Sequence, residues 1–126
     1  MKKKIYVCGN PLVDRDSMPF KILPELKALL PELEFIDFDP TENFPKDNPL
    51  YIVDTVINAR RVVVIKDLKG LEAAPHLSSH DADLAFHLKW LEKMGKLPRL
   101  TIFGVPAQGD GKNILQDLAE LIEKET

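Results

Sequence analysis

Residues 50–56 read Leu-Tyr-Ile-Val-Asp-Thr-Val, and this stretch decides the fold expected of the chain. Its first four residues are all apolar, which is typical of a strand buried on both faces of a sheet. Asp54 and Thr55 then interrupt the apolar run, so we expect the strand to end there. A strand buried on both faces needs a helical layer on each side, and the stretch therefore predicts an α/β protein.

The flanking segments supply the remaining elements of such a protein. Short runs rich in β-branched and aromatic residues predict four more strands, at residues 5–8, 33–38, 61–65 and 100–105. Apolar residues at helical spacing predict three helices, at residues 17–30, 81–94 and 114–122. Residues 39–49 hold three prolines without periodicity and are expected to form a long loop.

One connection indicates a strand direction. Only residues 56–60 join the strands expected at 50–53 and 61–65, which is too short for the helical crossover between parallel neighbours. We therefore expect these two strands to be antiparallel. The predicted fold is a three-layer α/β sandwich in which residues 1–126 form one domain. Its five-stranded sheet is mostly parallel, with one antiparallel strand and helices on both faces.

Composition limits the function classes. The 17 Lys and Arg residues against 20 Asp and Glu residues give a net charge of −3, so nucleic acid and anionic lipid are not expected as partners. The single cysteine, Cys8, excludes an internal disulfide and is expected to be a buried, inert thiol in a reducing compartment. No secretory signal follows residues 1–4, and no stretch reaches the ~20 apolar residues of a membrane span. We expect a cytoplasmic protein without membrane insertion.

Three polar residues are predicted to meet at the carboxyl edge of the sheet, where ligands bind in folds of this kind. Asp16 follows the first strand, Asp54 ends the third, and His80 starts the helix after the fourth. Two carboxylates and one imidazole make a partial coordination shell for a borderline divalent cation, with positions open for water or substrate. Each residue also has a structural alternative: Asp16 can cap its helix, Asp54 can hold a turn, and His80 can be a polar residue at a helix start.

Other candidate sites have less support. His76 and His80 are four residues apart, but no Glu follows the first of them as in a zinc-protease helix. Residues 109–112, Gly-Asp-Gly-Lys, lack the spacing of a phosphate-binding loop and are expected to be a loop with a helix start. His87 lies on the polar side of its predicted helix and is expected to be solvated. No Gly-x-Ser-x-Gly pattern supports a serine hydrolase.

Three segments together carry a resemblance. Residues 7–16 read Val-Cys-Gly-Asn-Pro-Leu-Val-Asp-Arg-Asp, residues 51–56 read Tyr-Ile-Val-Asp-Thr-Val, and residues 79–84 read Ser-His-Asp-Ala-Asp-Leu. In this order they resemble the motifs of the hydrogenase maturation endopeptidases, a nickel-dependent family that trims the hydrogenase large subunit. Further similarity, through Gly95 and residues 102–106, extends the resemblance from about residue 5 to residue 122.

The resemblance implies a function and a site. It implies a phosphorylase/hydrolase-like fold and a monomeric endopeptidase that removes the C-terminal tail of a nickel-loaded hydrogenase large subunit precursor. Asp16, Asp54 and His80 take the positions of the family's catalytic metal contacts. Nickel would arrive with the substrate, and zinc or cadmium would substitute for it.

Two alternatives remain. The family's Gly-Asp-Asp-Gly is here Asp-Arg-Asp-Ser at residues 14–17, so the basic Arg15 stands beside an expected ligand. This departure favours a non-catalytic homologue that binds a metal or the large subunit. A receiver-like signalling domain, with Asp54 as phosphoacceptor, is the second alternative. It would need an acidic pair after the first strand, where this chain has Gly9 and Asn10.

Overall fold

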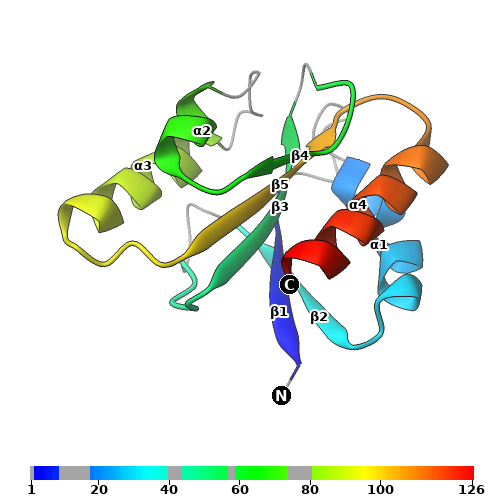
Figure 1. Cartoon of the computed structure of the whole chain (residues 1–126), viewed down its shortest axis with the longest axis horizontal. Coiled ribbons are helices and arrows are strands. Elements are labelled where there is room, and N and C mark those ends of the chain that lie inside the picture. The colour runs from blue at the N-terminus through cyan, green and yellow to red at the C-terminus, as the bar shows by residue number, and fades with distance from the viewer. Residues whose placement is uncertain (1, 9–17, 40–43, 57–58, 74–80) are drawn as a thin grey trace.

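A computed structural model describes residues 2–8, 18–39, 44–56, 59–73 and 81–126 of the chain. Side chains are described for all of these residues except 72–73 and 81–83. The described elements, in chain order, are β1 (Lys3–Cys8), α1 (Met18–Leu29), β2 (Leu33–Phe38), β3 (Leu50–Val56), β4 (Val63–Ile65), α2 (Leu68–Ala73), α3 (Asp81–Lys93), β5 (Leu100–Pro106) and α4 (Gly111–Glu125). Figure 1 shows them around one central sheet.

The sheet has five strands in the order β2-β1-β3-β5-β4. All neighbours are parallel except β4, which runs antiparallel to β5. The expected mostly parallel sheet with one antiparallel strand is therefore confirmed. The antiparallel strand does not pair with β3, however, because β5 lies between them and pairs with β3 from Leu50↔Leu100 to Val56↔Pro106. Two long apolar strands thus occupy the centre, and the three-residue β4 takes the edge.

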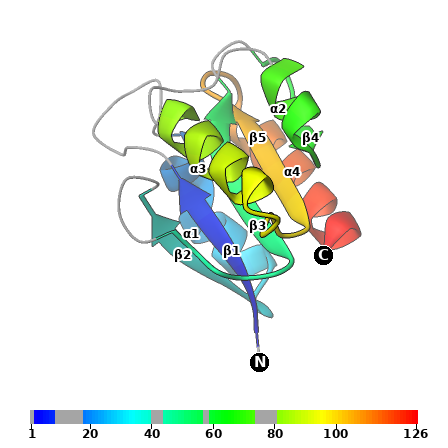
Figure 2. The ribbon, with the colours of Figure 1, turned by 90° about the vertical axis from the view of Figure 1, so that its left-hand side faces the viewer.

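Helices cover both faces of the sheet, which gives the three-layer sandwich expected from the sequence (Figure 2). Side-chain alternation along each strand divides the core in two. Val53 and Phe103 pack with α1 and α4 on one face, in a cluster that includes Leu26 and Leu118. Ile52, one residue along β3, points the other way and packs with Leu68, Leu71, Leu84 and Leu88 from α2 and α3 and Ile102 from β5.

The structure corrects two expectations about the elements. β3 continues through Asp54 to Val56, so the expectation that Asp54 ends the strand is wrong. The helix α2 was not predicted, because its six residues include Gly70 and are too few to show helical periodicity. Leu68 and Leu71 nevertheless lie one turn apart and are both buried, which explains why this segment is helical.

The ends of α3 and α4 follow local capping rules. Gly95 has φ 69°, the left-handed conformation of a residue that terminates a helix, as expected after α3. Asp110 caps α4 by accepting a hydrogen bond from the backbone N–H of Lys112 at 2.9 Å. This cap starts α4 at Gly111, three residues before the predicted start, and confirms that residues 109–112 are a loop and a helix start. None of the described helices is long and apolar enough to cross a bilayer.

Candidate active site

Asp54 lies in the middle layer of the protein, near the carboxyl end of β3. It is two residues beyond Ile52 and therefore points to the α2/α3 face of the sheet. Its exposed fraction is 0%, and among the described residues Asp54 and Thr55 are the buried polar or charged ones. A carboxylate removed from water in this way is uncommon in a protein of this size and indicates a specific role.

The backbone around Asp54 fixes its orientation. The N–H of Thr55 donates to Asp54 Oδ1 at 2.8 Å. On one side, the register partner of Asp54 on β5 is Gly104. On the other side, β1 and β3 pair at Tyr6↔Ile52 and Val7↔Val53, and this register continued by one residue places Cys8 level with Asp54.

Gly104, the register partner of Asp54, lies where β3, β4 and β5 pack closely. A Cβ atom built on Gly104 would lie 2.5 Å from Cγ2 of Val56 and 2.7 Å from Cγ2 of Val63, well inside van der Waals contact. The glycine therefore serves the close packing of β3, β4 and β5 rather than room for a ligand.

Asp16 and His80 lie outside the described residues, so their positions relative to Asp54 stay a prediction. The elements that follow them in the chain are described. Asp16 is two residues before α1, which connects the carboxyl end of β1 to the start of β2. His80 immediately precedes α3, which leads to the start of β5, a strand parallel to β3. Both helices thus begin at the edge of the sheet near which Asp54 lies.

The described part of the site is compatible with a divalent metal. Asp54 supplies carboxylate oxygen, a donor that suits borderline and hard cations, and one histidine would add the borderline nitrogen that nickel or zinc prefers. No group of three or more His, Cys, Asp or Glu side chains with metal-binding geometry occurs among the described residues. Two of the three expected ligands lie beyond those residues, so the triad of Asp16, Asp54 and His80 stays a prediction.

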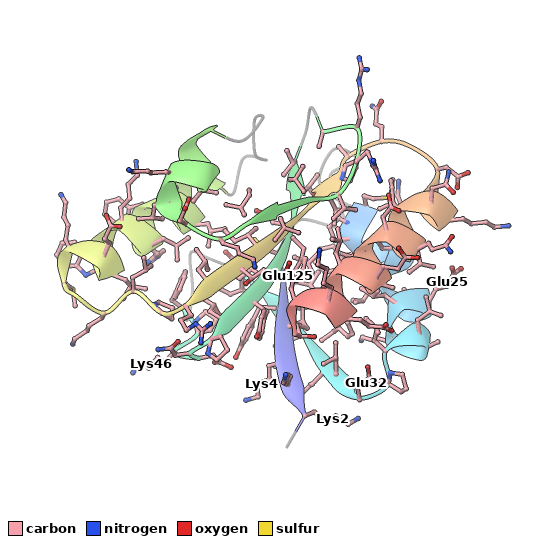
Figure 3. All side chains as sticks on the ribbon, in the orientation of Figure 1. Lys2, Lys4, Glu25, Glu32, Lys46 and Glu125 are labelled. Atoms are coloured by element: carbon pink, nitrogen blue, oxygen red, sulfur yellow. The ribbon has the colours of Figure 1, made fainter. Side chains whose placement is uncertain are left out.

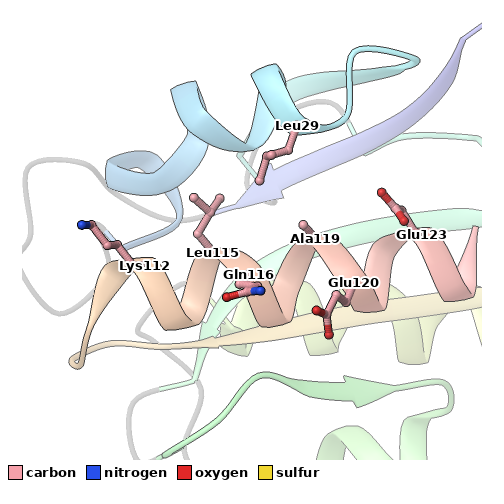
Figure 4. A pocket seen from close by; sticks show the side chains of 7 residues that line it. All are labelled: Leu29, Lys112, Leu115, Gln116, Ala119, Glu120 and Glu123. Atoms are coloured by element: carbon pink, nitrogen blue, oxygen red, sulfur yellow. The ribbon is translucent and has the colours of Figure 1, made fainter.

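Other hollows of the surface lie away from Asp54. One of about 390 Å³ lies between α1 and α4, on the opposite face of the sheet (Figure 4). In that view Leu29 of α1 faces Leu115 and Ala119 of α4, with the charged Lys112 and Glu123 toward the two ends. Its open, helix-surface character offers no convergent set of polar groups, so we do not assign it chemistry.

A polar contact that sequence reasoning missed joins β1 to the segment before β3. The hydroxyl of Tyr6 donates to Asp47 Oδ1 at 2.8 Å. Burial of the phenol, then this hydrogen bond and the negative charges of Asp47 and Glu34, raise the pKa of Tyr6 to about 12. The two residues are 41 positions apart in the chain, and no local pattern relates them.

Comparison with known proteins gives a likeness of fold. No family model and no curated protein matches the sequence. Among solved structures, the hydrogenase maturating endopeptidase HybD from E. coli superposes with a TM-score of 0.58 and 18% identity, covering 99% of this chain and 89% of that chain. This chain has the fold of HybD. An uncharacterized protein from Wolinella succinogenes shares it with a TM-score of 0.53 and 11% identity, covering 99% and 94% of the two chains.

The HybD-like topology also bears on the receiver-like alternative. Receiver domains have a parallel sheet in the order 2-1-3-4-5. The order here is β2-β1-β3-β5-β4 with β4 antiparallel, so the last two strands are exchanged. The receiver-like alternative is therefore not supported by the sheet.

Proposed function

We propose that this protein is an endopeptidase that removes the C-terminal tail of a nickel-loaded hydrogenase large subunit precursor. The observation that carries the proposal is a fully buried carboxylate, Asp54, near the carboxyl end of the central strand of a HybD-like fold. The sequence motifs that resemble the hydrogenase maturation endopeptidases support it independently, since they include Asp54 and the segments before α1 and α3.

In this proposal Asp16, Asp54 and His80 hold the nickel ion that the substrate presents. The ion supplies Lewis-acid polarisation of the scissile carbonyl. Asp54 contributes a negatively charged oxygen whose direction is set by β3 and by the Thr55 N–H at 2.8 Å. Because the carboxylate is shielded from water, its interaction with a cation is stronger than it would be at the surface. Because the Asp54 carboxylate is already oriented, it would position the metal-bound precursor with little further loss of side-chain entropy.

The test is a processing assay. The full chain is incubated with nickel-loaded large subunit precursor, and loss of the tail is followed by mass spectrometry. We expect cleavage by the native protein and a loss of about a thousandfold or more in the Asp54→Asn variant, since removing a metal-binding charge forfeits several kcal/mol of stabilisation. Asp37→Asn is the matched control, because Asp37 is an exposed carboxylate on β2 of the same sheet.

The outcomes separate the proposal from its alternative. Cleavage that depends on Asp54 but not on Asp37 supports the endopeptidase. Binding of the precursor without cleavage would support the non-catalytic homologue that Arg15 favours. Cleavage that survives Asp54→Asn would contradict the assignment of the site.

A further inference from the structure

The helix α3 carries an apolar stripe on its solvent side. Phe86, Trp90 and Met94 follow one another at intervals of four residues, with exposed fractions of 66%, 55% and 44%. Residues four apart lie on one face of a helix, so the three side chains form a continuous line. The opposite side of α3 supplies Leu84 and Leu88 to the core, both fully buried. The helix is therefore apolar on two sides, and only one of them is covered by the sheet.

A groove of about 510 Å³ continues the stripe at the end of α3. Leu91 and Met94 line it together with Phe44, Pro45 and Pro98. The stripe and the groove share Met94, so they are one surface, here called the α3 surface. Figure 2 shows α3 lying across the outside of this face of the sheet.

The wall of the groove opposite α3 is fixed in place by contacts along residues 44–48. The ring of Phe44 packs 5.1 Å from the ring of His87, which is half-buried rather than solvated as the sequence suggested. Asp47 accepts the hydrogen bond from Tyr6, and Asn48 Oδ1 accepts one from the backbone N–H of Arg99 at 3.0 Å. The groove is preformed, which lowers the entropic loss of filling it.

Cations lie beside the stripe and in the groove of the α3 surface. Lys89 and Lys93 are exposed, and each follows a stripe residue by three positions, which places them along one side of the stripe. Lys46 and Lys96 line the groove together with Asp47, whose carboxylate accepts the hydrogen bond from Tyr6. Lys46 extends from the same side of the molecule as α3 in Figure 3. Among the described side chains from residue 84 to residue 99, Glu92 is the acidic one. Four lysines against the two carboxylates of Glu92 and Asp47 give the apolar surface a net positive border, in a chain whose net charge is −3.

We propose that the α3 surface is a docking site for an acidic amphipathic segment of a partner protein. Apolar side chains of that segment pack on Phe86, Trp90 and Met94 and enter the groove, while its carboxylates face Lys46, Lys93 and Lys96. Trp is the residue type that most often dominates binding energy at protein interfaces, and Trp90 lies at the centre of the stripe. The docking site stands apart from the peptidase proposal, since it uses none of the candidate site residues.

Two other occupants fit less well. A second copy of this chain, packed stripe against stripe, would bring the lysines of both copies together. A bilayer would meet a helix already anchored to the sheet by Leu84 and Leu88, and its acyl chains would not use the polar groups that line the groove. A protruding polypeptide side chain suits a groove of this shape, as in helix-in-groove recognition.

The chain contains its own reporter for the test, because Trp90 is its only tryptophan. The probe is a synthetic amphipathic peptide with Leu on one helical face and Glu on the other. A matched peptide carries Lys in place of each Glu. We expect saturable binding of the Glu peptide to the full chain, a shift of Trp90 emission to shorter wavelength, and binding at least about tenfold weaker for the Lys peptide.

Matched variants locate the binding surface. Phe86→Ser and Met94→Ser retain the reporter and should weaken binding about tenfold or more each. Leu29→Ser is the control, since Leu29 is 54% exposed on α1, behind the sheet. Lys93→Glu and Lys96→Glu should weaken binding and reduce its dependence on salt, whereas Lys2→Glu, at an exposed lysine ahead of β1, should not.

Four results would overturn the proposal. They are the absence of saturable binding of the Glu peptide, equal binding of the Lys peptide, binding unchanged in both serine variants of the stripe, and preference for another occupant. The last is measured with phosphatidylglycerol–phosphatidylcholine vesicles, for a membrane, and by sedimentation equilibrium, for a second copy. Loss of peptide binding with retained precursor cleavage, or the reverse, distinguishes this proposal from the peptidase proposal.

Discussion

Asp54 on β3 and Gly104 on β5 are register partners at the centre of the sheet. On its other side Gly104 pairs with Val63 of β4. At this level of the sheet, Gly104 is therefore the β5 residue that lies between Asp54 of β3 and Val63 of the edge strand. The close approach of Val56 and Val63 to the missing Cβ shows that this position accepts no larger residue without movement.

We expect Gly104→Ala to destabilise the protein by about 1–3 kcal/mol, the usual range for overpacking a core. The free energy of unfolding is measured by urea denaturation. Gly111→Ala is the control, because its new Cβ would have Ile22 as its nearest neighbour at 3.9 Å, an ordinary contact in the first turn of α4. That variant should be neutral or slightly stabilised, by up to about 1 kcal/mol. Partial rescue of Gly104→Ala by Val63→Ala would identify the clash, and equal stability of both alanine variants would contradict it.

Asp16 distinguishes a metal ligand from a helix cap. Asn caps a helix about as well as Asp, so Asp16→Asn leaves a purely structural role nearly intact. If Asp16 is a ligand, we expect metal affinity to fall at least about tenfold, since loss of even an outer partner of a metal ligand has effects of that size. The melting temperature should stay nearly unchanged. Calorimetric titration with Ni²⁺ or Zn²⁺ checks the affinity, and a variant that still binds metal and cleaves the precursor normally would exclude the ligand role.

His80→Ala tests the third expected ligand. An imidazole at a helix start contributes little packing, so we expect a change in stability of no more than about 0.5 kcal/mol. Metal binding, already weak with three protein ligands, should become undetectable by calorimetry. His87→Ala is the control, because His87 lies about two turns into α3, where its ring packs against the ring of Phe44. Loss of metal binding in the control instead would move the site along α3.

The raised pKa of Tyr6 predicts that the stability of the protein falls at alkaline pH. The phenol titrates at about pH 10 in the unfolded chain and at about 12 in the folded one. Its contribution is therefore complete below pH 10 and is lost as the pH rises toward 12. Tyr6→Phe should lower the free energy of unfolding by about 1 kcal/mol at neutral pH, because the hydrogen bond to Asp47 is lost. Between pH 10 and 12, the free energy of unfolding of the variant should decline less steeply than that of the native protein. Tyr51→Phe, which removes the other tyrosine hydroxyl of the chain, controls for the phenol itself. Parallel pH curves for native and Tyr6→Phe proteins would contradict the assignment.

Local signals in the sequence were sufficient for most of the sheet. The strand expected at residues 33–38 has the bounds of β2, because apolar alternation and prolines at 31 and 40 mark both ends. The short connection before β4 was enough to infer that this strand runs antiparallel. It did not indicate that β4 pairs with β5. That pairing depends on β5, 39 positions beyond Val64 at Phe103, and a contact at that separation leaves no local pattern.

The candidate site was likewise found from a local sequence signal, whereas the α3 surface depends on contacts between distant segments. Asp54 was found because it interrupts an apolar run, a signal contained in seven residues. The groove was not, since residues 44–48 and 91–98 meet only in the folded chain. Helical spacing predicted a helix through Met94, yet Met94 is 44% exposed, because it lies in line with Phe86 and Trp90 on the solvent side.

The burial of Cys8 makes the chain report on its own local unfolding. Cys8 is the only thiol and is fully inaccessible on β1, beside the central strand. We therefore expect a thiol reagent to modify only molecules in which the structure around Cys8 has opened. When reclosing is fast, the modification rate relative to that of the unfolded chain gives the opening free energy directly. Measured with and without metal or peptide, this rate would tell whether either ligand holds the sheet closed, without any label or substitution.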